Sequence, residues 1–155
     1  MNILVVYDSY FGNTEKIAQR IAETRGEDTS IHRVQDVSMD LLKNLDLFVL
    51  GPPTRAFRPS DATKVFLAKL ERNTLEGVKV AAFDTRMNPE KVGNPILGFM
   101  VRIFGYAAKP IADKLVKRGG VLVGEPIGFE VVESEGPRYE GELERAETWA
   151  RGLLS

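Results

Sequence analysis

The chain has 155 residues, which is the length of one domain, so we expect residues 1–155 to fold as a single unit with a sizeable core. Its 21 basic and 22 acidic side chains give a formal net charge of −1, whereas a dedicated nucleic-acid-binding protein would carry a basic excess. The sequence has no cysteine and one histidine, His32, which excludes disulfides, thiolate nucleophiles, iron–sulfur clusters and histidine metal clusters. Because its side chains offer little reactivity of their own, we expect a bound cofactor.

Apolar runs that predict strands alternate with helical patterns along the whole chain. In chain order we expect a strand at 3–7, a helix at 15–24, an edge strand at 30–34 with a solvated His32, a strand at 47–50, a helix at 62–71, a strand at 78–83, a helix at 110–118, a strand at 121–123 that can resume at 129–132, and a helix at 142–154. The buried strands are continuously aliphatic, which is typical of a parallel sheet covered on both faces. The alternation of the two element types predicts a doubly wound α/β sheet.

In such a sheet, ligands bind at the carboxyl ends of the strands, near the point where the strand order reverses. The first candidate loop is residues 8–14, Asp-Ser-Tyr-Phe-Gly-Asn-Thr, which follows the first strand and opens the first helix. Hydroxyl groups of Ser9 and Thr14, the amide of Asn13 and the N–H groups of the first helical turn would meet there, and these donors suit a phosphate. The same residue types also cap helices, so a plain helix cap at Asn13 or Thr14 is the alternative interpretation.

Two further loops at carboxyl ends of strands have an unusual composition. Residues 51–59, Gly-Pro-Pro-Thr-Arg-Ala-Phe-Arg-Pro, combine prolines with two arginines and an aromatic ring. Residues 84–89, Asp-Thr-Arg-Met-Asn-Pro, place a hydroxyl and an arginine directly after the strand at 78–83. The first of these two loops could equally be a proline-rich turn with solvated arginines.

Residues 7–18, Tyr-Asp-Ser-Tyr-Phe-Gly-Asn-Thr-Glu-Lys-Ile-Ala, resemble the phosphate loop of the flavodoxins. Residues 51–55, Gly-Pro-Pro-Thr-Arg, are similar to the Ser-Pro-Thr-Arg loop of flavodoxin-like quinone reductases. The likeness extends over the whole chain. It implies a flavodoxin-like fold, with a five-stranded parallel sheet in the order 2-1-3-4-5 and helices on both faces, and it implies FMN as the cofactor.

The resemblance also implies which residues would bind FMN. The phosphate would lie against Ser9, Tyr10, Phe11, Gly12, Asn13 and Thr14. One side of the isoalloxazine ring would face Pro53, Thr54, Arg55, Ala56 and Phe57, and the other side would face Asp84, Thr85, Arg86 and Met87. The flavin would supply the chemistry, so neither a catalytic side chain nor a metal is expected.

The sequence departs from the flavodoxin pattern at three points. Tyr10 and Phe11 stand where electron-carrying flavodoxins usually have Thr or Ser, so two phosphate hydroxyls are lost. The tryptophan that often stacks on the flavin is absent from residues 51–59, where Phe57 is the nearest substitute. Such carriers are also usually strongly acidic, whereas this chain is nearly neutral. Arg55, Arg58 and Arg86 would therefore place positive charge near the ring and raise its reduction potential.

The function that the resemblance implies is electron transfer through a non-covalent flavin, to a redox partner protein or to a small electron acceptor. A flavodoxin-like quinone or NAD(P)H oxidoreductase is one alternative, and an interaction module that has lost FMN is another, so the choice between carrier and enzyme stays open. A phosphorelay receiver domain is disfavoured because Gly51 and Gly124 follow the third and fifth strands, where it needs an acid and a lysine. An α/β-hydrolase is disfavoured because the chain has no Gly-x-Ser-x-Gly elbow.

The apolar segments of the sequence indicate where the protein is located and how it could assemble. The opening residues lack the basic and small-residue flanks of a signal peptide, and the apolar stretch 96–108 is interrupted by Arg102 and is too short to cross a bilayer. We therefore expect a cytoplasmic protein that does not insert into membranes. Residues 94–106 carry more apolar side chains than a connector needs, so we expect a lid beside the flavin, a subunit contact or an extra buried turn there.

Overall fold

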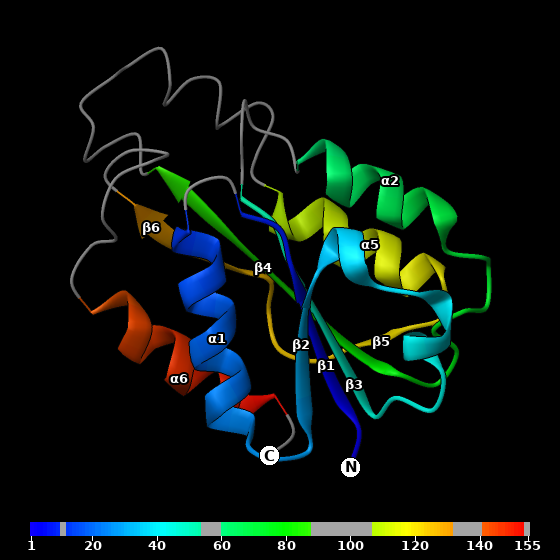
Figure 1. Cartoon of the computed structure of the whole chain (residues 1–155), viewed down its shortest axis with the longest axis horizontal. Helices are drawn as coiled ribbons and strands as arrows, with labels where there is room; N and C mark the ends of the chain where they lie inside the picture. Colours follow the sequence, from blue (N-terminus) through cyan, green and yellow to red (C-terminus); the bar gives the residue numbers. More distant parts are fainter. Residues whose placement is uncertain (10–11, 54–59, 88–106, 132–140, 154–155) are drawn as a thin grey trace.

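The computed structural model describes residues 1–9, 12–53, 60–87, 107–131 and 141–153. A parallel sheet runs through the molecule in the order β2-β1-β3-β4-β5, with β6 also paired to β4 (Figure 1). The strands are β1 (Ile3–Tyr7), β2 (Thr29–Arg33), β3 (Leu47–Gly51), β4 (Lys79–Met87), β5 (Val121–Leu122) and β6 (Ile127–Val131). The expected order 2-1-3-4-5 is therefore confirmed.

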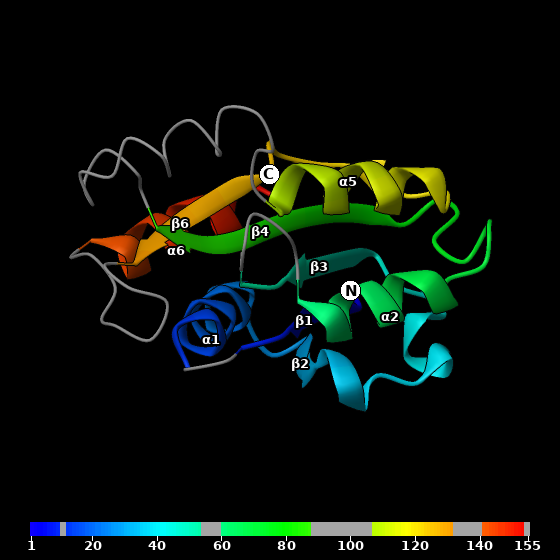
Figure 2. The ribbon, with the colours of Figure 1, turned by 90° about the horizontal axis from the view of Figure 1, so that it is seen from above.

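Helices cover both faces of the sheet, as expected. Figure 2 shows α1 and α6 on one face and α2 and α5 on the other. Their bounds are α1 (Asn13–Arg25), α2 (Asp61–Lys69), α5 (Ala108–Lys117) and α6 (Glu142–Gly152), and the short 3-10 helices η1 (Val34–Asp36) and η2 (Met39–Leu42) follow β2. Helix α2 begins where predicted, because the Ser60 hydroxyl accepts a hydrogen bond from the N–H of Thr63 at 3.3 Å.

The core has two halves, because successive residues of a strand point to opposite faces of the sheet. In β1, Leu4 and Val6 pack toward α2 and α5, whereas Ile3, Val5 and Tyr7 pack toward α1 and α6. Both halves of the core are closed by apolar helix residues, and burial of each large side chain stabilises the fold by about 1.5–3 kcal/mol. This packing fixes the carboxyl ends of β1, β3 and β4 at one edge of the sheet.

Two short strands, β5 and β6, pair with the outer side of β4, where a single fifth strand was expected. Strand β5 ends at Leu122, opposite Val80, and β6 begins at Ile127, opposite Phe83. The chain therefore advances five residues (122 to 127) while β4 advances three (80 to 83), so two residues are surplus and the edge strand is interrupted. Pro126 lies in the interruption and has no N–H for strand pairing. The apolar run after residue 123 does resume as a strand, as the sequence indicated.

The sequence interpretation also ended β4 too early. Residues 84–87, which were expected to form a loop, continue the strand to Met87 because β6 pairs with them in register. His32 lies in β2, opposite Val6, and is half-buried, so it is less exposed than expected.

A glycine at the end of β3 permits a close contact between neighbouring strands of the sheet. The position of a Cβ atom at Gly51 is occupied by the ring of Phe83 on the neighbouring strand. The Phe83 ring is fully buried and meets Phe129 and Trp149 edge to face, at centroid distances of 5.9 and 6.1 Å. Three aromatic rings therefore depend on the missing side chain.

We predict that Gly51→Ala lowers the free energy of unfolding by about 1–3 kcal/mol, because the Phe83 ring must move out of a close-packed position. Gly152→Ala is the matched control, since a Cβ atom there has no neighbour within 4 Å, and it should leave stability unchanged or slightly increased. Chemical denaturation of the two variants measures the difference. Equal losses in both variants would contradict the prediction.

Candidate functional site

The described residues of the three loops that the sequence singled out lie together where β1, β3 and β4 run beside the start of α1 (Figure 1). The N–H of Asp8 donates to the carbonyl of Gly51 at 3.1 Å, and the N–H of Thr85 donates to the carbonyl of Pro52 at 3.4 Å. Pro53 and Thr85 also form an isolated parallel bridge. Segments from three strands thus share one edge of the sheet, as a doubly wound fold requires of its ligand site.

The turn between β1 and α1 leads into the helix through a left-handed glycine. The Ser9 hydroxyl accepts the N–H of Gly12 at 2.8 Å, and Gly12 has φ = 94°, a left-handed conformation that glycine adopts at little cost. Gly12 is the N-cap of α1, so the cap supplies no side-chain acceptor for the first helical turn. The N-cap is therefore Gly12, and not Asn13 or Thr14 as the alternative interpretation supposed. The helix dipole and the first-turn N–H groups point at the loop instead.

A hydroxyl pair links this turn to β4. The side-chain oxygens of Thr14 and Thr85 lie 2.8 Å apart, and both residues are buried, with 2% and 5% of their surface exposed. Each hydroxyl has one hydrogen, and their mutual bond uses only one of the two. The second hydrogen has no acceptor within the described residues.

Two carboxylates flank the same turn, and an arginine from the edge strand contacts both. Asp8 is 4% exposed, and its Oδ1 accepts the N–H of Ser9 at 2.9 Å. Arg33, at the end of β2, lies 3.9 Å from Asp8 Oδ1 and donates to Glu15 Oε2 at 3.3 Å. The sequence analysis missed Arg33. The register could have indicated it, because Arg33 is opposite Tyr7 and the two strands end at the same level.

Arg86 does not present a free positive charge, contrary to expectation. Its Nε and Nη2 donate to the two carboxylate oxygens of Asp84, each at 2.6 Å, and Asp84 is fully buried. Asp84 Oδ2 also accepts the N–H of Ala108 at 2.8 Å, at the start of α5. The Arg86 guanidinium occupies the place of a side chain at Gly128 on β6. The pair therefore joins β4, β6 and α5, and the charge of Arg86 is compensated within the protein.

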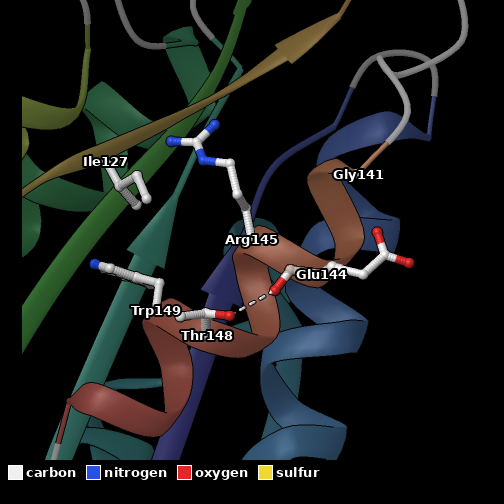
Figure 3. Close-up of a pocket in the computed structure, with 6 residues that line it drawn as sticks. All are labelled: Ile127, Gly141, Glu144, Arg145, Thr148 and Trp149. Atoms are coloured by element: carbon white, nitrogen blue, oxygen red, sulfur yellow. Dashed lines mark hydrogen bonds between the residues drawn. The ribbon is translucent and has the colours of Figure 1, made fainter.

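A hollow of about 450 Å³ lies elsewhere, between β6 and α6 (Figure 3). Among the described residues it is lined by Ile127, Gly141, Glu144, Arg145, Thr148 and Trp149, none of which belongs to the three loops. The Trp149 indole donates to the carbonyl of Glu125 at 3.1 Å, and Arg145 bonds to Glu142 at 2.9 Å. Since none of these lining residues comes from the carboxyl ends of β1 and β3, the candidate site remains at the end of β1.

Neither a metal centre nor a membrane span is found in the part of the chain that the structure describes. No three His, Asp or Glu side chains there are grouped to hold a metal ion, and none of its helices combines the length and apolarity needed to span a bilayer.

Comparison with known proteins identifies the family. A family model described as a flavodoxin domain matches residues 4–122, which is more than half of the chain. This chain belongs to the flavodoxin family. A flavodoxin of Maridesulfovibrio salexigens is 28% identical over 159 residues, covering 97% of this chain and 94% of the relative.

Solved structures confirm the flavodoxin fold. Flavodoxin 1 of Bacillus cereus superposes with a TM-score of 0.77 at 21% identity, covering 99% of this chain and 97% of the other. Flavodoxin 2 of the same organism gives 0.74 at 25% identity, with the same coverage. The rubredoxin oxygen:oxidoreductase of Desulfovibrio gigas gives 0.74 at 16% identity, and the match covers 98% of this chain but 35% of that chain. At that identity the last match shows the fold alone.

The flavodoxin site predicted from sequence is described in part. Ser9, Gly12, Asn13 and Thr14 lie together in the turn, and Pro53 and Thr85 meet beside it. Asp84 and Arg86 pair with each other on the strand face that carries α5, and the backbone of Met87 closes β4. The remaining predicted residues lie outside the described part: Tyr10, Phe11, Thr54, Arg55, Ala56 and Phe57, together with Arg58 and the segment 94–106.

We predict that Arg86→Gln destabilises this flavodoxin by about 2–4 kcal/mol, because the buried Asp84 loses its counter-charge; the partial exposure of Arg86 reduces the effect below that of a fully buried pair. Arg151→Gln is the matched control. Its ion pair with Glu147 spans 3.7 Å between side chains that are 68% and 30% exposed, and its loss should cost less than about 1 kcal/mol. Urea denaturation measures the free energy of unfolding of both variants. Similar losses would show that the Arg86–Asp84 pair stabilises the fold no more than an exposed ion pair does.

Tyr7 makes the stability of the fold depend on pH in the alkaline range. Burial raises the pKa of the Tyr7 hydroxyl above its ordinary value of 10.0, and the Glu15 carboxylate raises it further, against the opposing charge of Arg33. The unfolded chain therefore loses this proton first, and the free energy of unfolding falls as the pH rises past about 10. We predict a shallower fall in Tyr7→Phe. Denaturation at a series of pH values measures both slopes, and parallel slopes would exclude Tyr7 as the titrating group.

Proposed function

We propose that this flavodoxin binds FMN non-covalently and carries electrons between redox partners. Proteins of the family bind FMN and transfer electrons to partner proteins, and the proposal extends both properties to this chain. The observation that supports it most is the turn from Ser9 to Thr14. In its described residues, a left-handed Gly12 is the N-cap of α1 and no side-chain hydrogen bond caps the helix there.

The turn suits the phosphate end of FMN for physical reasons. Its donors are backbone N–H groups at a helix N-terminus, which favour an anion without any lysine. The spare hydrogen of the Thr14–Thr85 hydroxyl pair adds a buried donor that a phosphate oxygen can accept. Because Tyr10 and Phe11 bring no aliphatic hydroxyl, we infer that backbone N–H groups, Ser9 and Thr14 hold the phosphate.

The flavin ring would lie beyond the phosphate, next to the bridge between Pro53 and Thr85. Bound FMN supplies the redox chemistry, since it accepts and returns electrons one or two at a time. The protein's residues bind and orient the ring and limit its access to water. The residue sets 53–57 and 84–87 stay our proposal for the two sides of the ring.

Electrostatics favour an electron carrier over the quinone or NAD(P)H oxidoreductase. Arg86 is one of three arginines expected to raise the flavin potential, but its guanidinium is paired with Asp84 at 2.6 Å. This pairing weakens the case for an oxidoreductase with a high flavin potential and favours an electron carrier. The potential is then set by groups other than Arg86. The partner in electron transfer would be a redox protein or a small electron acceptor.

We predict that FMN binds at least about 100-fold more tightly than riboflavin, because two charge-assisted hydrogen bonds to the phosphate are worth more than about 2.7 kcal/mol together. Thr14→Val should weaken FMN binding and leave riboflavin binding unchanged. Thr24→Val is the control on the same helix, where the hydroxyl donates to the carbonyl of Arg20 at 2.7 Å. Quenching of flavin fluorescence measures the affinities of the wild type and of both variants for FMN and riboflavin. Equal affinities of the wild type for FMN and riboflavin would refute the phosphate site.

A further inference from the structure

The proposed phosphate site carries two negative charges of its own. Asp8 begins the turn and is buried, with its carboxylate bonded to the N–H of Ser9. Glu15 lies in the first turn of α1, where its side chain is 34% exposed. Both charges would repel a phosphate dianion, and repulsion between charges is strengthened in the lower dielectric of a protein. Something must offset them if the turn is to bind an anion well.

Arg33 is placed to offset both carboxylates. Its Nη2 donates to Glu15 Oε2 at 3.3 Å, and its Nη1 lies 3.9 Å from Asp8 Oδ1. The same Nη1 donates to the carbonyl of Ser9 at 3.3 Å, so the guanidinium is fastened to the backbone of the turn. The guanidinium also lies over the ring of Tyr7, 5.4 Å from its centroid, and this contact helps to orient the Arg33 side chain toward the turn.

Gln35 completes the arrangement around Asp8. Its side-chain amide donates to Asp8 Oδ1 at 3.4 Å from η1, directly after the edge strand. Arg33 and Gln35 thus come from the end of β2 and from η1, and β2 lies beside β1 in the sheet. Since the two ends of the Arg33 guanidinium are engaged by Ser9 and Glu15, we expect Arg33 to act on a ligand through these residues.

We propose that Arg33 is a positioning residue that neutralises Asp8 and Glu15 and thereby sets the affinity of the turn for the phosphate end of FMN. This inference rests on the proposed function. It assigns to the edge strand a part in ligand selection. It also explains how a turn with two acidic neighbours and no lysine can take a dianion.

The test compares affinities for FMN and riboflavin, which differ by the phosphate alone. Arg33→Gln should weaken FMN binding about tenfold and leave riboflavin binding within about twofold. The matched control is Arg20→Gln, which removes the same charge from a side chain that is 32% exposed and paired with Glu147 at 3.6 Å. Arg20 belongs to α1 but contacts no residue of the turn in the described structure, so this control should bind FMN as the wild type does.

A double variant separates neutralisation from a purely structural contact. If Arg33 acts by offsetting Glu15, then Glu15→Gln in the Arg33→Gln background should restore most of the lost FMN affinity. If Arg33 only holds the turn in shape, the second substitution removes another contact and FMN affinity stays low or falls further. Failure of the rescue would overturn the inference.

Two outcomes keep this inference apart from the proposed function. If wild-type protein binds FMN no better than riboflavin, the phosphate site itself is wrong. If the wild type discriminates and Arg33→Gln discriminates equally well, only the role of Arg33 is wrong. Should Arg33→Gln not fold, Arg33→Lys replaces it, because lysine keeps the charge and loses the forked geometry. Retained preference for FMN then supports neutralisation, and lost preference overturns it.

Discussion

Strand β4 is the element on which both the sheet and the site depend. Its first half is apolar and lies between β3 and β5, whereas its second half is polar and pairs with β6. Because side chains alternate, Phe83 and Thr85 face α1 and α6 while Asp84 and Arg86 face α5. One strand therefore holds an aromatic cluster, a buried ion pair and the hydroxyl that meets Thr14.

Charges near the site are balanced within the protein and not by solvent alone. Asp84 is satisfied by Arg86 and the start of α5, and Asp8 is satisfied by Ser9, Arg33 and Gln35. Burial of a carboxylate is tolerated only when such partners are present. Each of these carboxylates is thus offset by a particular partner, which the composition alone does not reveal.

The sequence predicted the framework better than the site. Within the described residues, apolar runs located the strands and the helix pattern located α1, α2, α5 and α6, because burial is written into the order of apolar residues. The strand order and the expected cofactor came from the resemblance of residues 7–18 and 51–55 to a known family. The polar residues 84–87 were misread as a loop because their partners, α5 and β6, are distant in sequence. Arg33 was missed for the same reason, since its role depends on strand register.

The interruption between β5 and β6 also shapes how the protein meets its neighbours in solution. An open sheet edge offers unpaired backbone groups to any extended chain, and long apolar edges promote aggregation. Val121 and Leu122 are 54% and 41% exposed on this edge, which is the composition of a sticky strand. Strand β5 is nevertheless only two residues long, because the surplus residues and Pro126 interrupt the pairing with β4 before β6 begins. The break in the strand thus protects a surface that would otherwise recruit further β-structure.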